Sequence, residues 1–418
     1  MSEHSQPRAV RGPEQRAPEY ELLSREGAAE PFGIYQRIRE QAPVYWSRVM
    51  HCWLIMGYEE VTQSFRHPLL SSRRVEQTLE VQLQHLAPSS KKDVLRLSKK
   101  LITMKDVPEH IFTRKWTGRG FGPHLLATWR PLVQRVVDEV LEKVRGREGM
   151  DVVKDFAEPI PAQVMAGLFG VSPSDQEHFH QCAERVAAFF GGASRALEQA
   201  VPVANKAIGE LELYFQQRIA EQRSRPEDNL LGLWLAGHEG QELDVEDVVA
   251  QCIAAIVGGN ITTADQIAIG VDVLLRHPEQ LRKLREQPEL FKPAMEELLR
   301  FDSSVPFMHR VVQDDFELGG QRLKKGQMVF LGLTAANHDP TVYEEPERFD
   351  VTRKPGQHLG YGTGRHVCLG IHLARVELEL GLGTLFTRMP DLRLDSARPA
   401  RPRFNWVTRG YESLPVRF

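Results

Sequence analysis

The sequence predicts a mainly α-helical protein with small β-sheets, folded as one large domain. Three observations support this fold class. Apolar residues recur at spacings of three and four along most of the 418 residues, which is the period of an amphipathic helix. Strand-like alternation is confined to a few short stretches. No shift in composition and no linker rich in Pro or Ser divides the chain.

The composition argues against several classes of protein. A hydrophobic content of 41% and a charged content of 26% are values of a globular protein. A formal net charge of −3 gives no general affinity for nucleic acid or for an acidic membrane surface. The four cysteines lie far apart without a Cys-x-x-Cys pair, which argues against a disulfide framework and structural zinc and favours the reducing cytoplasm. They are Cys52, Cys182, Cys252 and Cys368.

The N-terminal segment differs from the rest of the chain. Residues 1–17 are polar and contain no apolar stretch, so we expect a flexible arm and neither a signal peptide nor a membrane anchor. Residues 18–418 are expected to form a single domain. No later run approaches about 18 uninterrupted apolar residues, so we expect a soluble monomer that does not bind a membrane.

Helical periodicity is clearest in four segments. The longest begins at Asp244, an N-cap residue with Asp247 three positions later as in a capping box, and its pattern continues to about Arg276. That length is enough to cross an entire domain. The other three segments are EVLEKVRG, ANKAIGELELYFQQRIAEQRS and PAMEELLRF.

Strands are predicted in three places. The stretches APVYWSR and CWLIMG near the start are typical of a hairpin. The stretch RVVQDDFELGGQRLKKGQMVFLGL contains two or three further strands around Gly319 and Gly320. The C-terminal stretch RFNWVTRGYESLPVRF is expected to add another pair.

Residues 358–370, HLGYGTGRHVCLG, place four glycines around a single cysteine. Glycine is normally kept where φ is positive or where another body approaches the main chain, so a buried inert thiol does not explain the pattern. His366 and Cys368 supply at most two of the ligands that zinc needs, and a nucleophile needs a base and a group that orients it. A large flat cofactor against the loop, with a thiolate on haem iron, explains both the glycines and the lone cysteine.

This loop resembles the haem-ligand loop of the cytochrome P450 family, Phe-x-x-Gly-x-x-x-Cys-x-Gly. Tyr361, Gly364, Cys368 and Gly370 fall on the pattern, with Tyr in place of Phe. The resemblance implies the cytochrome P450 fold, with the long central helix crossing over the haem, and haem b (iron-protoporphyrin IX) with an axial thiolate from Cys368. The following stretch, IHLARVELELGLG, is helical, so its dipole and free amides favour the thiolate.

Further marks of the family occur in order from about residue 30 to the C-terminus. Glu297 and Arg300 lie one helical turn apart in EELLR. The family completes this pair with an arginine of a PERF segment, which is Arg348 here. The resemblance implies a structural Arg–Glu–Arg network that holds the cysteine loop on the helical core; an ordinary surface ion pair is the alternative.

The resemblance also implies four cationic groups that bind the two haem propionates. His110 and Arg114 share a helix face in KDVPEHIFTRKW. Arg310 matches the arginine at the start of the strand that crosses the haem edge, and His366 lies in the cysteine loop itself. The planar fork of arginine matches a carboxylate. A surface role is the alternative for each residue.

The long helix contains the segment AAIVGGNITTADQ, where the family activates dioxygen. Gly258 and Gly259 cost about 1 kcal/mol each in mid-helix, which implies either a groove for O₂ and water or close packing against a neighbouring helix. The family's catalytic threonine corresponds to Thr262. The acid that usually precedes it is replaced by Ile261, so proton delivery would depend on water held by Thr262 and Asn260.

The residues expected to line the substrate pocket are small or apolar. Some share the helix face of Thr262, and others come from the stretch SSVPFMHR. Because the helix residues are small, we expect a bulky hydrophobic substrate, such as a terpenoid, a steroid or a polyketide-like molecule. The pocket residues are Ala254, Val257, Gly258, Val305, Pro306, Phe307 and Met308.

No glycine fingerprint for flavin or nicotinamide occurs in the chain. The resemblance therefore implies that a separate ferredoxin, with its ferredoxin reductase, supplies electrons. Such an acidic partner would meet a basic face on the cysteine side. The residues expected there are Lys115, Arg119, Arg130 and Arg365.

Together these observations predict a haem-dependent monooxygenase that hydroxylates a hydrophobic organic substrate with O₂. Two alternatives stay open. Ile261 makes an isomerase or dehydratase on the same fold plausible, because such chemistry does not need the usual acid. A hydrolase without haem, with Cys368 as the nucleophile, is the alternative outside the class.

Overall fold

The structure is a computed structural model, and it describes six stretches of the chain. The arm expected at residues 1–17 lies outside them, apart from its last residue. The described stretches are residues 17–75, 79–190, 197–236, 243–354, 356–403 and 408–418.

Helices make up most of the described chain, which confirms the predicted fold class. Three of the four segments with helical periodicity are helical throughout, and EVLEKVRG is helical only as far as Glu142. The α-helices are α1 (Glu19–Leu22), α2 (Arg25–Ala29), α3 (Phe32–Gln41), α4 (Tyr58–Arg66), α5 (Pro88–Lys100), α6 (Glu109–Thr117), α7 (Leu126–Glu142), α8 (Pro159–Leu168), α9 (Gln176–Phe190), α10 (Leu197–Ser224), α11 (Leu230–Leu235), α12 (Val245–Arg276), α13 (Pro278–Glu286), α14 (Phe291–Phe301), α15 (Leu333–Asn337) and α16 (Ile371–Arg388).

The strands of the described residues are short and form four small sheets. The largest has the order β1-β2-β8-β5-β3, and the others pair β10 with β11, β6 with β7, and β4 and β9 with β12. The strands are β1 (Val44–Ser47), β2 (Cys52–Ile55), β3 (Leu70–Ser71), β4 (Gly149–Asp151), β5 (Phe307–Val312), β6 (Phe316–Leu318), β7 (Gln321–Leu323), β8 (Met328–Gly332), β9 (Arg393–Leu394), β10 (Arg401–Arg403), β11 (Gly410–Ser413) and β12 (Pro415–Arg417).

The predicted N-terminal hairpin is confirmed, since β1 pairs antiparallel with β2 and Val44 lies opposite Ile55. The segment around Gly319 and Gly320 contains four strands, β5 to β8, where two or three were predicted. The C-terminal stretch contains two strands, β11 and β12, as predicted, but they do not pair with each other. β11 pairs with β10, whereas β12 pairs with β4 and β9, because the chain passes from one small sheet to another between them.

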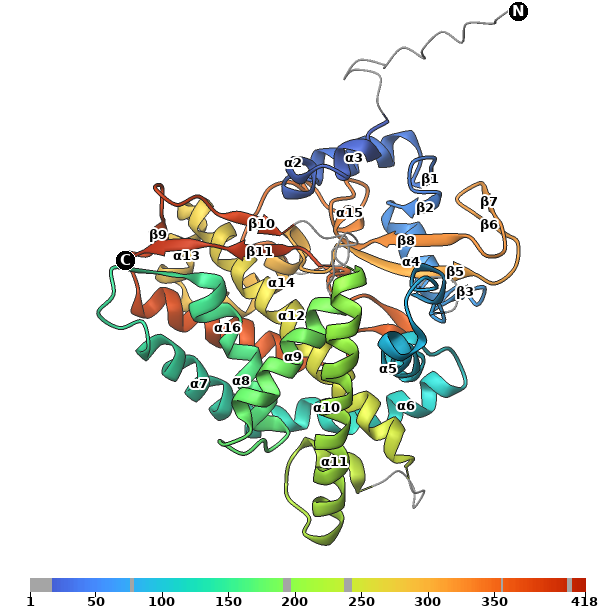
Figure 1. Ribbon diagram of the computed structural model, residues 1–418. Helices are drawn as coiled ribbons and strands as arrows, with labels where there is room; N and C mark the ends of the chain where they lie inside the picture. The colour runs from blue at the N-terminus through green and yellow to red at the C-terminus, as the bar shows by residue number, and fades with distance from the viewer. Residues whose placement is uncertain (1–16, 76–78, 191–196, 237–242, 355, 404–407) are drawn as a thin grey trace, which may run out of the picture.

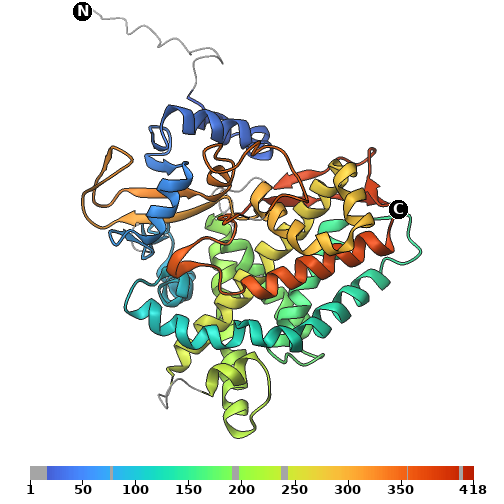
Figure 2. The same ribbon diagram turned by 180° about the vertical axis from the view of Figure 1, so that it is seen from behind.

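Figure 1 shows the largest sheet on one side of the molecule and the long helices on the other, and Figure 2 shows the same arrangement from behind. The main apolar cluster lies among the helices. Two smaller clusters cover the two faces of the large sheet. One includes Val61 and Phe65 of α4, and the other includes Ile34 and Ile38 of α3.

Helix α12 passes through the helical half and packs against α8, α9, α10 and α16. Its start is as predicted, because Asp244 caps it by accepting a hydrogen bond from the backbone N–H of Glu246 at 2.9 Å. Asp247 instead lies 3.5 Å from the ammonium nitrogen of Lys100. By length and composition alone α12 could cross a membrane, but 56% of its most apolar window is buried inside the described molecule, as in the core helix of a globular protein.

Candidate functional site

The cysteine loop ends at the N-terminus of α16, as the sequence predicts. The backbone N–H of Cys368 donates to the carbonyl of Tyr361 at 2.9 Å, and Gly370 is the N-cap residue of α16. Burial raises the pKa of the Cys368 thiol above its ordinary value. The N–H of Gly370 and the guanidinium groups of Arg114 and Arg375 act in the opposite direction. The helix terminus therefore favours the thiolate, as expected, but by less than burial disfavours it.

Glycine occupies the four positions of this loop for different physical reasons. Gly362 and Gly364 both have φ of +68°, a region that residues with a side chain rarely adopt. A Cβ added at Gly360 would lie 2.9 Å from the backbone oxygen of Leu299 on α14. A Cβ added at Gly370 would meet no atom within 4 Å. Only Gly370 adjoins open space in the way that a cofactor approach requires.

Gly360→Ala is expected to lower the free energy of unfolding by about 1–3 kcal/mol, because backbone atoms cannot yield to the new methyl group. Gly383→Ala, inside α16, is the matched control. Its Cβ would meet Phe291 only at 3.9 Å, so a gain of about 0.5–1 kcal/mol is expected. Urea unfolding of the purified variants, followed by circular dichroism, measures both. Equal shifts in the two variants would contradict the close approach of the loop to α14.

The structure brings the four predicted propionate-binding residues together around the cysteine loop. The imidazole rings of His110 and His366 lie 4.1 Å apart between centroids. Nε2 of His366 lies 3.1 Å from the Ser72 hydroxyl, and Arg114 donates to the carbonyl of Val367 at 2.7 Å. Burial lowers the pKa of both histidines, and the positive charge of Arg310 adds to this effect, so this arginine belongs to the same cluster.

Two further cations belong to this cluster and were not predicted as propionate ligands. Burial and the charge of Arg74 lower the pKa of Arg310 to about 9. The charge of Arg365 adds to the effect of burial in lowering the pKa of His110 and His366. Arg74 follows β3 in the stretch SSRR, where no motif marks it. Its place in the cation cluster is therefore evident only from the folded structure.

This cluster has more positive charge than its own carboxylates balance. Nη2 of Arg310 and Nδ1 of His110 are buried without a hydrogen-bond partner among the described residues. Burial, with Arg114 next, lowers the pKa of His110 to about 4. Among the described residues, Asp106 alone opposes the shifts of Arg310 and His110. Two propionate carboxylates would pair with these atoms and reduce the repulsion, so the residues present fit a haem group.

One face of α12 is open although the helix lies in the core. Gly258 is exposed, and a Cβ added there would meet no atom within 4 Å. Ala254, Val257 and Thr262 are partly exposed on the same face. The Thr262 hydroxyl donates to the carbonyl of Gly258 at 2.7 Å. These four residues line open space, as the pocket prediction requires.

The sequence left two explanations for Gly258 and Gly259, open space or close packing, and each explanation applies to one of the two glycines. Gly259 allows close packing, since an added Cβ would lie 3.1 Å from the sulfur of Met165 on α8. Gly258 faces the open side. The helix itself is continuous from Val245 to Arg276, so the glycines do not interrupt it. The open space beside Gly258 comes from its missing side chain, not from an interruption of the helix.

The remaining predicted pocket residues lie on and before β5. Phe307 was predicted to face the pocket, and this is wrong. Its ring packs edge-on against that of Tyr35, 5.7 Å between centroids, in the apolar cluster beside α3. Alternate strand residues face opposite sides of a sheet, so Met308 shares the side of Arg310. Val305 and Met308 are partly exposed, and Pro306 is buried.

The predicted ion network exists, but with a different third member. Glu297 and Arg300 form a buried pair at 2.7 Å, with side chains only 3% and 2% exposed. Arg353 completes it, its Nε donating to Glu297 Oε1 at 3.1 Å. The prediction of Arg348 was wrong, because Glu345 holds that guanidinium at the surface at 2.9 Å. The backbone carbonyl of Arg348, rather than its side chain, accepts from Arg300.

Two contacts join this network to the cysteine loop. Arg300 donates to the carbonyl of Asn337 at 3.0 Å, and the Asn337 side chain accepts from the N–H of Leu359 at 2.7 Å. Glu296, beside Glu297, pairs with Arg375 of α16 at 2.7 Å. The loop is therefore held by α14 at both of its ends, in agreement with the structural role predicted for the network.

The residues expected to form a basic face differ in exposure. Lys115, Arg119 and Arg365 are exposed. Arg130 forms an ion pair with Glu379 at 2.8 Å, so its charge is largely balanced within the chain. Three of the four predicted residues are therefore exposed, and the fourth is partly exposed.

Comparison with known proteins gives a consistent result. The family model described as Cytochrome P450 matches residues 76–390. The chain is 32% identical over 402 residues to the biotin biosynthesis cytochrome P450 of Bacillus subtilis, covering 94% of this chain and 98% of that protein. It is 30% identical to the polyketide biosynthesis cytochrome P450 PksS of the same organism, covering 92% and 95%.

Solved structures agree. The crystal structure of P450BioI in complex with a hexadec-9Z-enoic acid ligated acyl carrier protein superimposes with a TM-score of 0.85 at 31% identity. The match covers 94% of this chain and 99% of that one.

Proposed function

Because the chain belongs to the cytochrome P450 family of haem-thiolate monooxygenases, we propose that it hydroxylates a bulky hydrophobic molecule with O₂ and electrons from a ferredoxin. The observation that carries this proposal is the half-buried thiol of Cys368 beside a cation cluster that lacks enough anions of its own. We further propose that residues 18–418 act as one domain, as a monomer in the cytoplasm.

The protein residues have distinct roles in this proposal. Cys368 would supply the thiolate that binds the iron of an iron-protoporphyrin IX, and His110, Arg114, Arg310 and His366 would bind its propionates. When bound, the haem supplies the activation of dioxygen and the insertion of one oxygen atom into a C–H bond. The cluster orients the cofactor, because each guanidinium binds a carboxylate in a fixed plane.

The open face of α12 argues for a large substrate. Gly258, Ala254 and Val257 leave space that larger side chains would fill, and Val305 and Met308 add apolar surface. A terpenoid, a steroid or a polyketide-like molecule would suit such a pocket. The name of PksS, a polyketide biosynthesis cytochrome P450, supports the polyketide-like class. The complex of P450BioI with a fatty acid on an acyl carrier protein shows that a relative accepts a long apolar chain.

Proton supply is the step in which this chain departs from its family. Ile261 cannot carry a proton, and the Thr262 hydroxyl donates to Gly258. Asn260 Oδ1 is buried without a protein partner among the described residues, so it can accept from water. Asp265, one turn after Ile261, points toward Gly410 and pairs with Arg403. We propose that water held by Thr262 and Asn260 delivers the protons.

Ile261→Glu is expected to raise the amount of product formed per O₂ consumed by about tenfold, because it restores a proton donor before Thr262. Ile261→Gln, which has the same shape but no acid, is the matched control and should leave this ratio unchanged. Oxygen uptake, product and hydrogen peroxide are measured in the same reaction. Equal ratios in the two variants would exclude a proton-supply role for this position.

The exposed cations on the cysteine side suit an acidic ferredoxin. The direct test of the proposed function is turnover with a ferredoxin, its reductase and a nicotinamide donor on a panel of polyketide-like, steroid and terpenoid compounds. With ¹⁸O₂, the product is expected to contain one labelled oxygen atom. Compounds are selected first by the change that they cause in the spin state of the haem iron.

The replacement by Ile261 also favours a second candidate function, an isomerase or dehydratase on the same fold. The labelling experiment separates the two. A product that forms without labelled oxygen and without consumption of O₂ would establish the second function and exclude the first.

A further inference from the structure

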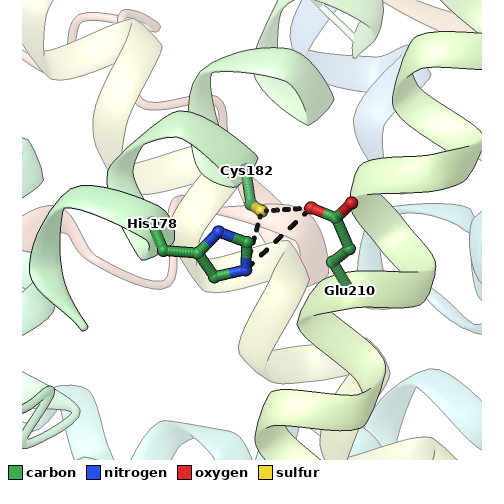
Figure 3. Close-up of side chains that lie close together, drawn as sticks. All are labelled: His178, Cys182 and Glu210. Carbon is green, nitrogen blue, oxygen red and sulfur yellow. Dashed lines mark hydrogen bonds and ion pairs between the residues drawn. The ribbon is translucent and has the colours of Figure 1, made fainter.

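A cluster of three different side chains joins helices α9 and α10 outside the proposed haem site. His178 and Cys182 lie one turn apart on α9, and Glu210 faces them from α10. Figure 3 shows the three side chains pointing toward one another across the space between the two helices. We propose that these residues form a binding site for a divalent zinc ion.

The distances between the three side chains are close to those of a tetrahedral zinc site. Cys182 Sγ lies 3.2 Å from Glu210 Oε2 and 3.8 Å from His178 Nε2. His178 Nε2 lies 3.9 Å from the same carboxylate oxygen. Ligand atoms about 2.0–2.3 Å from a tetrahedral zinc ion lie about 3.3–3.6 Å from one another. Movements of a few tenths of an ångström would therefore bring the three atoms around one ion.

The chemical types of the three donor atoms favour zinc over calcium and magnesium. One nitrogen, one sulfur and one oxygen form a set that zinc accepts readily. Calcium and magnesium prefer oxygen ligands alone. The Cys182 side chain is buried, whereas 59% of the His178 side chain is exposed. An ion can thus reach the cluster from the His178 side, and water can complete the fourth position.

Two cations near Glu210 compete with a metal ion. Arg185 Nη1 lies 3.7 Å from Oε2, and Lys206 Nζ lies 3.8 Å from Oε1. Both distances are longer than a hydrogen bond, and the side chains are 41% and 78% exposed, so they can turn toward solvent. Removing the charge of Arg185 should therefore strengthen zinc binding, since like charges repel.

The site would link two consecutive helices that already pack against each other. Both α9 and α10 also pack against α12, so a zinc ion at Cys182 and Glu210 would fix the two helices to each other where they cover α12. The stretch HFHQC contains the first two ligands, but Glu210 lies 28 residues after Cys182. The absence of a Cys-x-x-Cys pair, which argued against structural zinc, does not exclude this site because its ligands come from two helices.

Equilibrium dialysis of the haem-loaded, chelator-treated protein against zinc chloride, followed by metal analysis, tests the proposal. We expect one zinc ion per chain, with affinity reduced about 100-fold or more in His178→Ala and Cys182→Ser. Arg185→Ala should increase the affinity. His180→Ala is the matched control, because this histidine of the same helix pairs with Glu184 at 3.1 Å and should leave zinc binding unchanged.

Thermal unfolding provides a second measurement. Zinc should raise the unfolding midpoint of the wild-type chain and of His180→Ala, but not that of Cys182→Ser. An unchanged visible spectrum of each variant confirms that it is folded. No retained zinc in the wild-type chain, or equal affinity in His178→Ala and His180→Ala, would overturn the proposal. Neither result depends on turnover, so the proposed monooxygenase function is tested separately.

Discussion

Cys368→Ala is expected to abolish turnover, lowering the rate by more than about 10³-fold, and to remove the red-shifted Soret band that reduction and carbon monoxide produce with a thiolate ligand. The thiolate is the proposed bond between protein and iron, and alanine offers no ligand atom. The spectrum of the reduced protein with carbon monoxide, together with turnover of a substrate from the panel, measures the effect.

Two further variants separate loss of the ligand from loss of the fold. Cys368→His offers a nitrogen ligand, so we expect retained haem without the red-shifted band. Cys52→Ala, at a buried thiol of β2 far from the loop in sequence, should keep the band and the activity. A Cys368→Ala protein with an unchanged spectrum and full turnover would exclude Cys368 as the iron ligand. It would not test the zinc site, whose residues are different.

Arg300→Ala is expected to destabilise the protein by about 3–5 kcal/mol, because it leaves the carboxylate of Glu297 buried without its main partner. Both side chains of this pair are almost completely buried. Arg300 also donates to the carbonyls of Asn337 and Pro346, so its loss leaves buried acceptors unpaired as well. Urea unfolding followed by circular dichroism gives the free energy of unfolding.

The same experiment tests which arginine completes the network. Arg348→Ala should leave the free energy of unfolding almost unchanged, because its 58% exposed side chain pairs only at the surface. Arg353→Ala should cost about 1–3 kcal/mol, since it donates to the buried Glu297 carboxylate. If Arg348→Ala were the more damaging of these two, the assignment of Arg353 would be wrong.

Features carried by neighbouring residues were predictable from the sequence. Asp244 and the apolar period after it located α12, because a helix closes its hydrogen bonds within four residues. The glycines and Cys368 predicted the loop before α16, because this pattern too is carried by residues close together along the chain. Pairings across the fold were harder to predict. The sequence alone allows either Arg348 or Arg353 to pair with Glu297. In the structure only Arg353 forms this ion pair, whereas Arg348 pairs with Glu345.

The sequence by itself determined the mainly helical class, the long helix, the cysteine loop and the family to which the chain belongs. Only the tertiary structure decided that Phe307 packs beside α3, that Gly258 faces open space while Gly259 packs on Met165, and that cations from distant segments gather near the cysteine loop. The physical reason is the range of the interactions. Helix and loop signals act between residues close along the chain, whereas burial and charge depend on which distant segments the fold brings together.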